Sequence, residues 1–144
     1  MQIVAALFAD DLYVRQVDGP STRLDLRGIK FSEAAAGPFP VRIEPHLFVI
    51  VRCAPGDSPD AVLEVRFLRQ GAAGDEHQGE PEQVARNVQP LQIEPAKYAY
   101  RLVRAELEFD APGTIEAHCS IDRGEPVVVP FTMLPAAAAA PAAS

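Results

Sequence analysis

Three polar side chains on one strand-like segment have the types that a hydrolase triad uses. Glu116, His118 and Ser120 alternate with apolar residues, so a β-strand would place them on one face. A nucleophile, a base and an orienting acid are the groups that acyl transfer needs. Neighbours on one strand do not by themselves provide that geometry or an oxyanion hole, and the chain has no G-x-S-x-G motif. We therefore expect an exposed strand histidine and no catalytic residues.

Two acidic loops contain the side chains of a metal site. His77 lies among carboxylates in residues 75–82, but the loop has no regular ligand spacing. Asp57 and Asp60 flank a Ser-Pro turn, whereas a calcium loop needs a denser series of ligands. We expect a solvated loop around His77, turn-forming roles for the two aspartates, and no metal ligands.

The pair Asp10 and Asp11 follows an apolar N-terminal run. Paired carboxylates can act as acid and base. With no partner identified, strand termination is the better interpretation of this pair. The chain also lacks G-x-x-x-x-G-K-[ST] and G-x-G-x-x-G, so we expect no nucleotide cofactor and no enzymatic activity.

The three tyrosines are the candidates for an aromatic binding surface. Tyr98 and Tyr100 would share one face of a strand and form a small platform for a sugar or a protein, and Tyr13 lies near the N-terminus. The alternative is packing at the edge of a β-sheet domain, with the hydroxyl groups hydrogen-bonded.

Composition limits the classes of partner. The 144 residues include 13 basic and 20 acidic side chains, which give a formal net charge of -7. A surface with this charge disfavours nucleic acid and anionic membranes as partners. The N-terminal apolar run lacks a positively charged flank, so we expect a first strand rather than a signal peptide, and a cytoplasmic protein.

Cys53 and Cys119 both lie on strand-like segments. Their separation is similar to that of the disulfide between the two sheets of immunoglobulin domains. In a cytoplasmic protein we expect two buried, reduced thiols instead.

The fold that these segments predict is all-β: a single antiparallel, immunoglobulin-like β-sandwich of about eight strands. Its domain spans residues 1–134, and the Ala/Pro-rich residues 135–144 form a disordered tail. Glu82–Asn87 could form one helical turn, Gly71–Pro81 a mobile loop and Ser32–Pro40 a crossing connection. Alternating apolar residues and turn signals place the strands at Gln2–Phe8, Arg23–Phe31, Leu47–Cys53, Val62–Arg69, Val88–Glu94, Tyr100–Phe109, Thr114–Ile121 and Glu125–Leu134, with Leu12–Val17 as a further short strand.

The last two strands predict a hairpin of defined register. A loop of three residues, 122–124, pairs Cys119 with Val127 and Ala117 with Val129, and so keeps the apolar sets on one face. A loop of two residues would place these sets on opposite faces. The three-residue loop also predicts a left-handed conformation at Gly124.

Short motifs resemble a family of small bacterial proteins known only as a domain of unknown function. They are Ile3, Ala6-Leu7 and Ala9-Asp10, then Leu24 to Gly28, then Pro38-Phe39-Pro40, with Gly113 before the closing hairpin. The resemblance implies a β-sandwich and a bacterial cytoplasmic origin, and it implies no activity.

With no chemistry in the sequence, the leading hypothesis is a non-enzymatic interaction or scaffold module. Its partner would be a protein, or a second copy of the chain in a homodimer. The alternative is a β-sandwich that binds a small ligand or a carbohydrate through its tyrosines and acidic loops.

Overall fold

A computed structural model describes residues 1–17, 19, 21–70 and 81–136. The described residues form strands and turns, with no helix, so the all-β class predicted from the sequence is confirmed. His77 and residues 137–144 of the proposed tail lie outside them. The described part contains twelve strands instead of about eight, namely β1 Gln2–Ala9, β2 Asp11–Gln16, β3 Thr22–Arg27, β4 Ser32–Ala34, β5 Val41–Ile43, β6 His46–Arg52, β7 Asp60–Arg69, β8 Glu82–Gln92, β9 Tyr98–Arg104, β10 Leu107–Phe109, β11 Gly113–Ile121 and β12 Val127–Leu134.

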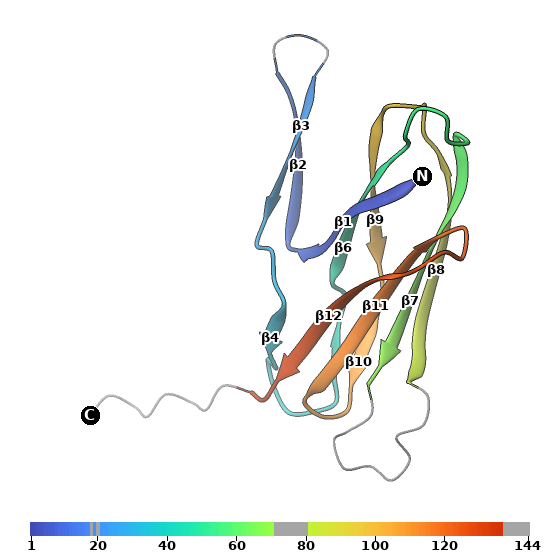
Figure 1. The fold of residues 1–144 in the computed structure, drawn as a ribbon. Helices are drawn as coiled ribbons and strands as arrows, with labels where there is room; N and C mark the ends of the chain where they lie inside the picture. Colours follow the sequence, from blue (N-terminus) through green and yellow to red (C-terminus); the bar gives the residue numbers. More distant parts are fainter. Residues whose placement is uncertain (18, 20, 71–80, 137–144) are drawn as a thin grey trace.

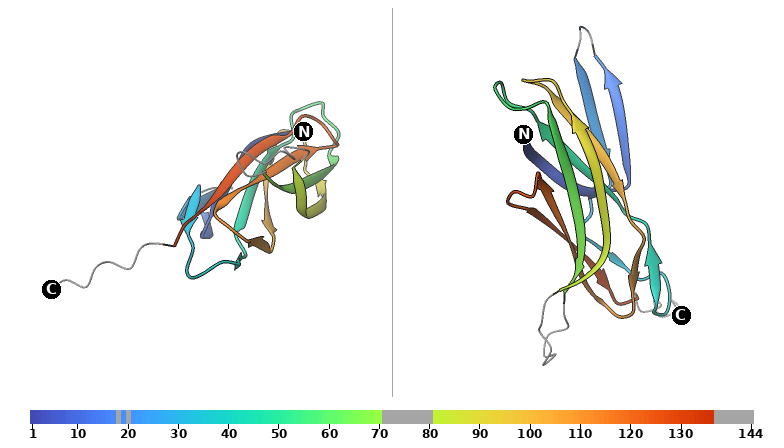
Figure 2. Two further views of the ribbon diagram at one scale, coloured as in Figure 1. Left: turned by 90° about the horizontal axis from the view of Figure 1, so that it is seen from below. Right: turned by 90° about the vertical axis from the view of Figure 1, so that its right-hand side faces the viewer.

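The strands form two larger sheets and two strand pairs (Figure 1). The five-stranded sheet has the order β4-β12-β11-β7-β8, and the three-stranded sheet has the order β1-β6-β9. Strands β10 and β5 pair with each other, as do β2 and β3. All pairings are antiparallel except that of β12 with β4. The β2–β3 hairpin extends beyond the rest of the molecule in both side views (Figures 1 and 2).

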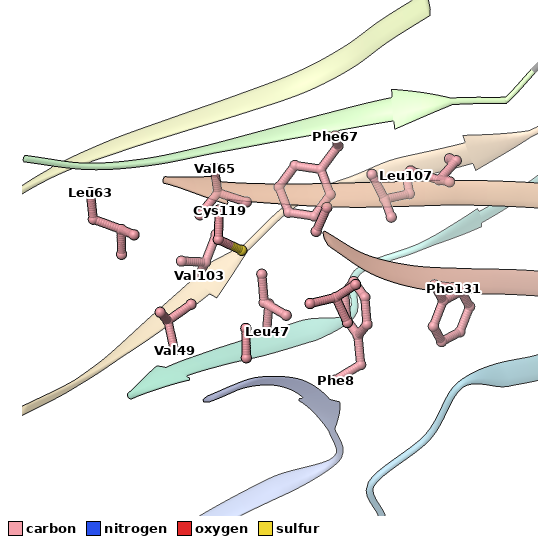
Figure 3. Packing of buried hydrophobic residues seen from close by; sticks show 14 of the residues in the cluster. Phe8, Leu47, Val49, Leu63, Val65, Phe67, Val103, Leu107, Cys119 and Phe131 are labelled. Atoms are coloured by element: carbon pink, nitrogen blue, oxygen red, sulfur yellow. The ribbon is translucent and has the colours of Figure 1, made fainter. Parts of the chain in front are cut away.

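The two larger sheets contribute to one hydrophobic core (Figure 3). Alternate residues of β7, Leu63, Val65 and Phe67, are at most 1% exposed, as the period-2 pattern predicts. The three-stranded sheet contributes Leu47 and Val49 to the same cluster. Across the core, the rings of Phe8 and Phe131 meet edge to face at 5.3 Å. Burying each such side chain contributes about 1.5–3 kcal/mol, so this core holds the sheets together.

The closing hairpin has the predicted register, but its turn differs. Cys119 pairs with Val127 and Ala117 with Val129, as predicted. Positive φ angles occur at Asp122 (48°) and Arg123 (59°), not at Gly124, whose N–H donates to the carbonyl of Ile121 at 2.8 Å. These features are typical of a two-residue type I′ turn. One extra residue between Gly124 and Val127 then acts as a bulge and restores the register.

Two long predicted strands are each interrupted. The segment Arg23–Phe31 is not one strand, because β3 ends at Arg27 and Gly28 takes a φ of 69°. The segment Tyr100–Phe109 divides into β9, which pairs with β6, and β10, which pairs with β5. In Tyr100–Phe109 the apolar alternation continues past the point where the pairing partner changes, so the sequence pattern cannot mark that break. In Arg23–Phe31 the apolar positions change phase at Gly28, where the strand ends.

The predicted helical turn at Glu82–Asn87 is wrong. These residues begin β8, which pairs with β7 along its whole length. Strand β8 lies at the edge of its sheet, and this position tolerates Pro90, which lacks an N–H. The crossing connection predicted at Ser32–Pro40 contains a short strand, β4, and a cis peptide bond between Phe39 and Pro40.

Both cysteines are free and fully buried, as expected. The apolar surroundings of Cys119 destabilise its thiolate and raise the pKa of the thiol to about 12. Within the described ranges, no helix has the length and apolar character that a membrane crossing requires.

Candidate functional site

The structure brings only two of the three side chains that resembled a triad into contact. His118 Nε2 lies 3.2 Å from Glu116 Oε1, and the amide of Gln70 donates to the same oxygen at 2.6 Å. We expected an exposed histidine, but His118 is half-buried. Its strand, β11, lies between β7 and β12, and Glu116 is next to its ring. Ser120 is buried, and its hydroxyl has no hydrogen bond to His118 in the described structure. The arrangement is an acid–histidine pair that does not activate a nucleophile.

Asp57 stabilises a turn, as the sequence predicted. Its carboxylate accepts the backbone N–H of Ala54 at 3.2 Å and the α-ammonium of Met1 at 2.7 Å. Both donors hold the pKa of Asp57 below its usual range. Asp60 begins β7, and its N–H contacts the hydroxyl of Ser58 at 3.3 Å. Across residues 1–70 and 81–136, apart from 18 and 20, no group of three potential ligands could hold a metal ion.

Asp10 ends the first strand and fixes the base of the β2–β3 hairpin. Its N–H donates to the carbonyl of Arg27 at 3.0 Å, and its carboxylate pairs with Lys30 at 3.0 Å. Gly28 lies directly against this carboxylate, since a Cβ added there would be 2.2 Å from Asp10 Oδ2. A side chain at this position would push the Asp10 carboxylate away from its present place and would adopt a strained positive φ. Asp11, by contrast, begins β2 opposite Arg27.

Two of the three candidate tyrosines line a cleft beside the hairpin. Tyr98 and Tyr100 are 61% and 37% exposed, and Tyr98 lies 6.0 Å from the guanidinium of Arg52. Tyr13 lies elsewhere, on the hairpin itself, with the Arg27 guanidinium 5.3 Å from its ring. The sequence therefore identified two cleft residues correctly and did not distinguish them from the third.

The cleft, with a volume of about 690 Å³, lies between β3 and β9. Thr22 and Leu24 of the hairpin line it, together with Ile50 of β6. Gln89 of β8 closes another side. Five consecutive residues of β9, Tyr98 to Leu102, complete the lining. Successive strand residues point to opposite faces, so a cleft lined by all five runs along the edge of β9.

The hydrogen bonds of β9 show which of its groups face this cleft. Strand β9 pairs only with β6, so its other edge has no strand partner in the described structure. The carbonyl of Tyr100 accepts a bond from the side chain of Arg101 at 2.9 Å, and that of Leu102 from Gln89 at 3.4 Å. Side chains thus reach the two carbonyls that point away from β6. Because backbone direction alternates, the N–H groups of Tyr100 and Leu102 point the same way.

The charge along this edge is positive, although the protein is acidic. Arg101 is the sole charged residue that lines the cleft within the described ranges. None of the ion pairs between described residues includes it. Arg104 is the second charged residue of β9, and the strand has no acidic residue.

Sequence reasoning missed most of this cleft. Leu24, Ile50 and Gln89 come from three distant segments, and each reads as an ordinary strand residue. The alternation of Tyr98 and Tyr100 was the available signal. It could not reveal that β9 is an edge strand, because that depends on the order of strands in the sheet.

Comparison with known proteins adds no family to this description. No protein-family model matches the chain, and no curated protein matches it.

Proposed function

We propose that the chain is a non-enzymatic interaction module, which binds its partner in the cleft between β3 and β9. The observation that carries this proposal is the combination of an apolar cleft with an unpaired strand edge. Sheet edges and apolar pockets are common recognition surfaces. The other candidate chemistry gives no support to an enzyme, since Glu116, His118 and Ser120 form no nucleophilic site.

The wider architecture supports the same proposal. A core shared by the three-stranded and five-stranded sheets is consistent with an immunoglobulin-like sandwich. In such a module the hairpin would present the binding wall, while the two sheets supply rigidity. Membership of the small bacterial family that the sequence resembles is part of the same proposal; two of its motif residues, Asp10 and Gly28, meet at the hairpin base. A cytoplasmic location is part of this proposal.

Capture from a lysate of the source organism tests the function when a matched variant is included. The double variant Leu24→Ser with Tyr100→Ser removes apolar contacts from the cleft. The control, Val88→Ser with Val128→Ser, removes two exposed valines from the five-stranded sheet. We expect a protein that the wild type and the control retain and the cleft variant loses. Identical sets of captured proteins from all three would contradict the proposal.

A small ligand or carbohydrate is the second candidate. The observation in its favour is that Tyr98, Tyr100 and Gln89 line the same cleft, since aromatic faces and amides are common sugar contacts. A ligand that binds the folded chain must raise its melting temperature. A sugar or metabolite that stabilises the wild type but not the cleft variant would favour this second function over a protein partner.

A further inference from the structure

We infer that the partner is an extended peptide segment with alternating apolar and acidic side chains, which adds a strand to the free edge of β9. This inference rests on the proposed interaction function and names the chemistry of its partner. It is carried by the backbone groups, the side chains and the charge along the cleft.

The backbone of β9 provides the pairing surface. The N–H groups of Tyr100 and Leu102 point away from β6, toward the cleft. The carbonyls of these residues are bonded to two side chains, Arg101 and Gln89, which can rotate away when a main-chain donor arrives. Five residues of strand span about 17 Å, so a peptide of roughly that length fills the cleft. Main-chain hydrogen bonds of this kind provide affinity in strand addition.

The walls of the cleft determine the side chains of the peptide. Tyr100 and its paired residue Ile50 lie on one face of the sheet, and with Leu24 they favour apolar groups in the cleft. Arg101, the next residue of β9, points to the other face, and its guanidinium favours a carboxylate; Gln89 lines the same cleft and offers an amide donor. Because strand residues alternate between faces, the matching sequence alternates between apolar and acidic residues.

Charge favours such a peptide over a second copy of this chain paired through β9. Two antiparallel copies of β9 would bring Arg101 and Arg104 of one copy near those of the other. Strand β9 has no acidic residue to compensate them. Like charges directly opposite across strands are destabilising, whereas an acidic peptide neutralises the same arginines.

Fluorescence anisotropy of labelled peptides tests the inference on the full chain. The probe is acetyl-Val-Glu-Val-Glu-Val-Glu-Val-amide, and its controls are the lysine analogue and two N-methylated forms, one for each edge of the peptide. We expect the acidic probe to bind and the lysine analogue to bind about tenfold more weakly or not at all. One N-methylated form should lose binding and the other should retain it, because only one edge of the peptide pairs with β9. Salt at about 1 M should weaken binding.

Variants of the protein locate the peptide. Arg101→Glu should weaken binding about tenfold or more, while Arg66→Glu, an exposed arginine of the five-stranded sheet, should leave it unchanged. Tyr100→Pro removes one N–H that faces the cleft. Its control is Val88→Pro on β8, at the position two residues before the natural Pro90. Circular dichroism establishes that each variant is folded, and the N-methylated peptides supply the same test if the proline variants unfold.

Each outcome separates the inference from the function on which it rests. No binding of the acidic probe, equal binding of the lysine analogue, or equal loss with both N-methylated forms would overturn the acidic strand. A dimer in sedimentation velocity that Arg101→Glu stabilises or Tyr100→Pro disrupts would identify a second copy as the occupant and would also overturn it. If the lysate experiment still yields a partner that depends on the cleft, the interaction function stands without this peptide chemistry.

Discussion

The turn at Asp122 and Arg123 permits a quantitative test of how the closing hairpin is built. A residue with a side chain in the left-handed region costs about 1–2 kcal/mol relative to the right-handed region. Arg123, at a φ of 59°, carries this cost. Arg123→Gly should therefore remove this backbone cost. Against this gain, glycine stabilises the unfolded chain by about 0.4–1 kcal/mol. We expect a net stabilisation of about 0.5–1 kcal/mol, measured as a higher urea midpoint at unchanged m.

Two further substitutions make the test specific to this turn. Asp122→Gly relieves the same backbone cost, but it removes the hydrogen bond that Asp122 Oδ1 accepts from the N–H of Val62 at 2.9 Å. That bond contributes about 0.5–1.5 kcal/mol, so the net effect should be close to zero. Gly124→Ala avoids the cost of a positive φ, because Gly124 has none, and it should cost below about 1 kcal/mol, which arises from the close contact of its Cβ with the Ile121 carbonyl oxygen at 3.1 Å. A loss above about 1 kcal/mol for Gly124→Ala, with no gain for Arg123→Gly, would refute the two-residue turn.

Three other predictions concern buried and junction residues. The pKa of Cys119 is raised from 9.0 to about 12, so above pH 9 the unfolded chain ionises this thiol while the folded protein keeps it neutral. The free energy of unfolding should therefore fall by about 1.4 kcal/mol per pH unit between these two values and be unaffected by this group below pH 9. Urea melts should show a steeper alkaline loss in the wild type than in Cys119→Ala, in which other groups still ionise; parallel curves would contradict the prediction. The hydrogen bonds that lower the pKa of Asp57 stabilise the fold at pH values above the ordinary carboxyl pKa. This stabilisation is lost as the pH falls through the pKa of Asp57 in the folded protein. The difference in melting temperature between the wild type and Asp57→Asn should therefore shrink below about pH 4, and a constant difference would exclude this role. A side chain at a positive φ costs about 1–2 kcal/mol. Gly28→Ala should destabilise the chain by more than this, because its Cβ would also overlap Asp10. A neutral effect in urea melts would mean that the hairpin base is built differently.

The elements that could be predicted from the sequence are those whose pattern and pairing agree. The alternation in β7 and β11 correctly identified the buried faces, because one side of each strand lies on the core. The register of β11 with β12 followed from the same constraint. The turn itself was not predictable, since a two-residue turn with a bulge gives the same register as a three-residue loop.

The features that could not be predicted depend on partners distant in sequence. The apolar alternation from Val103 to Phe109 crosses the boundary without interruption, yet β9 and β10 pair with different strands. Likewise, nothing in the residues of β9 indicates that it lies at an edge, beside Leu24 and Gln89. The candidate site is an edge and a cleft, and both are properties of strand order rather than of local pattern.

The β2–β3 hairpin supports the interaction function through its own energetics. A two-stranded hairpin is at best marginally stable in water, and this one exposes Tyr13 and Val14 by 47% and 50%. Its base is nevertheless fixed by Gly28, which takes a positive φ directly against the Asp10 carboxylate, and by the ion pair of Asp10 with Lys30. A hairpin needed only to connect β1 with β4 could be replaced by a shorter loop without loss from the core, since none of its described residues, 11–17, 19 and 21–27, belongs to the buried cluster. Its fixed base and its contribution of Leu24 to the cleft are instead the properties expected of a binding wall. Shortening the hairpin within residues 12–26 should therefore abolish partner capture while leaving the cooperative unfolding of the core intact, and loss of folding would show that the hairpin stabilises the domain rather than its interactions.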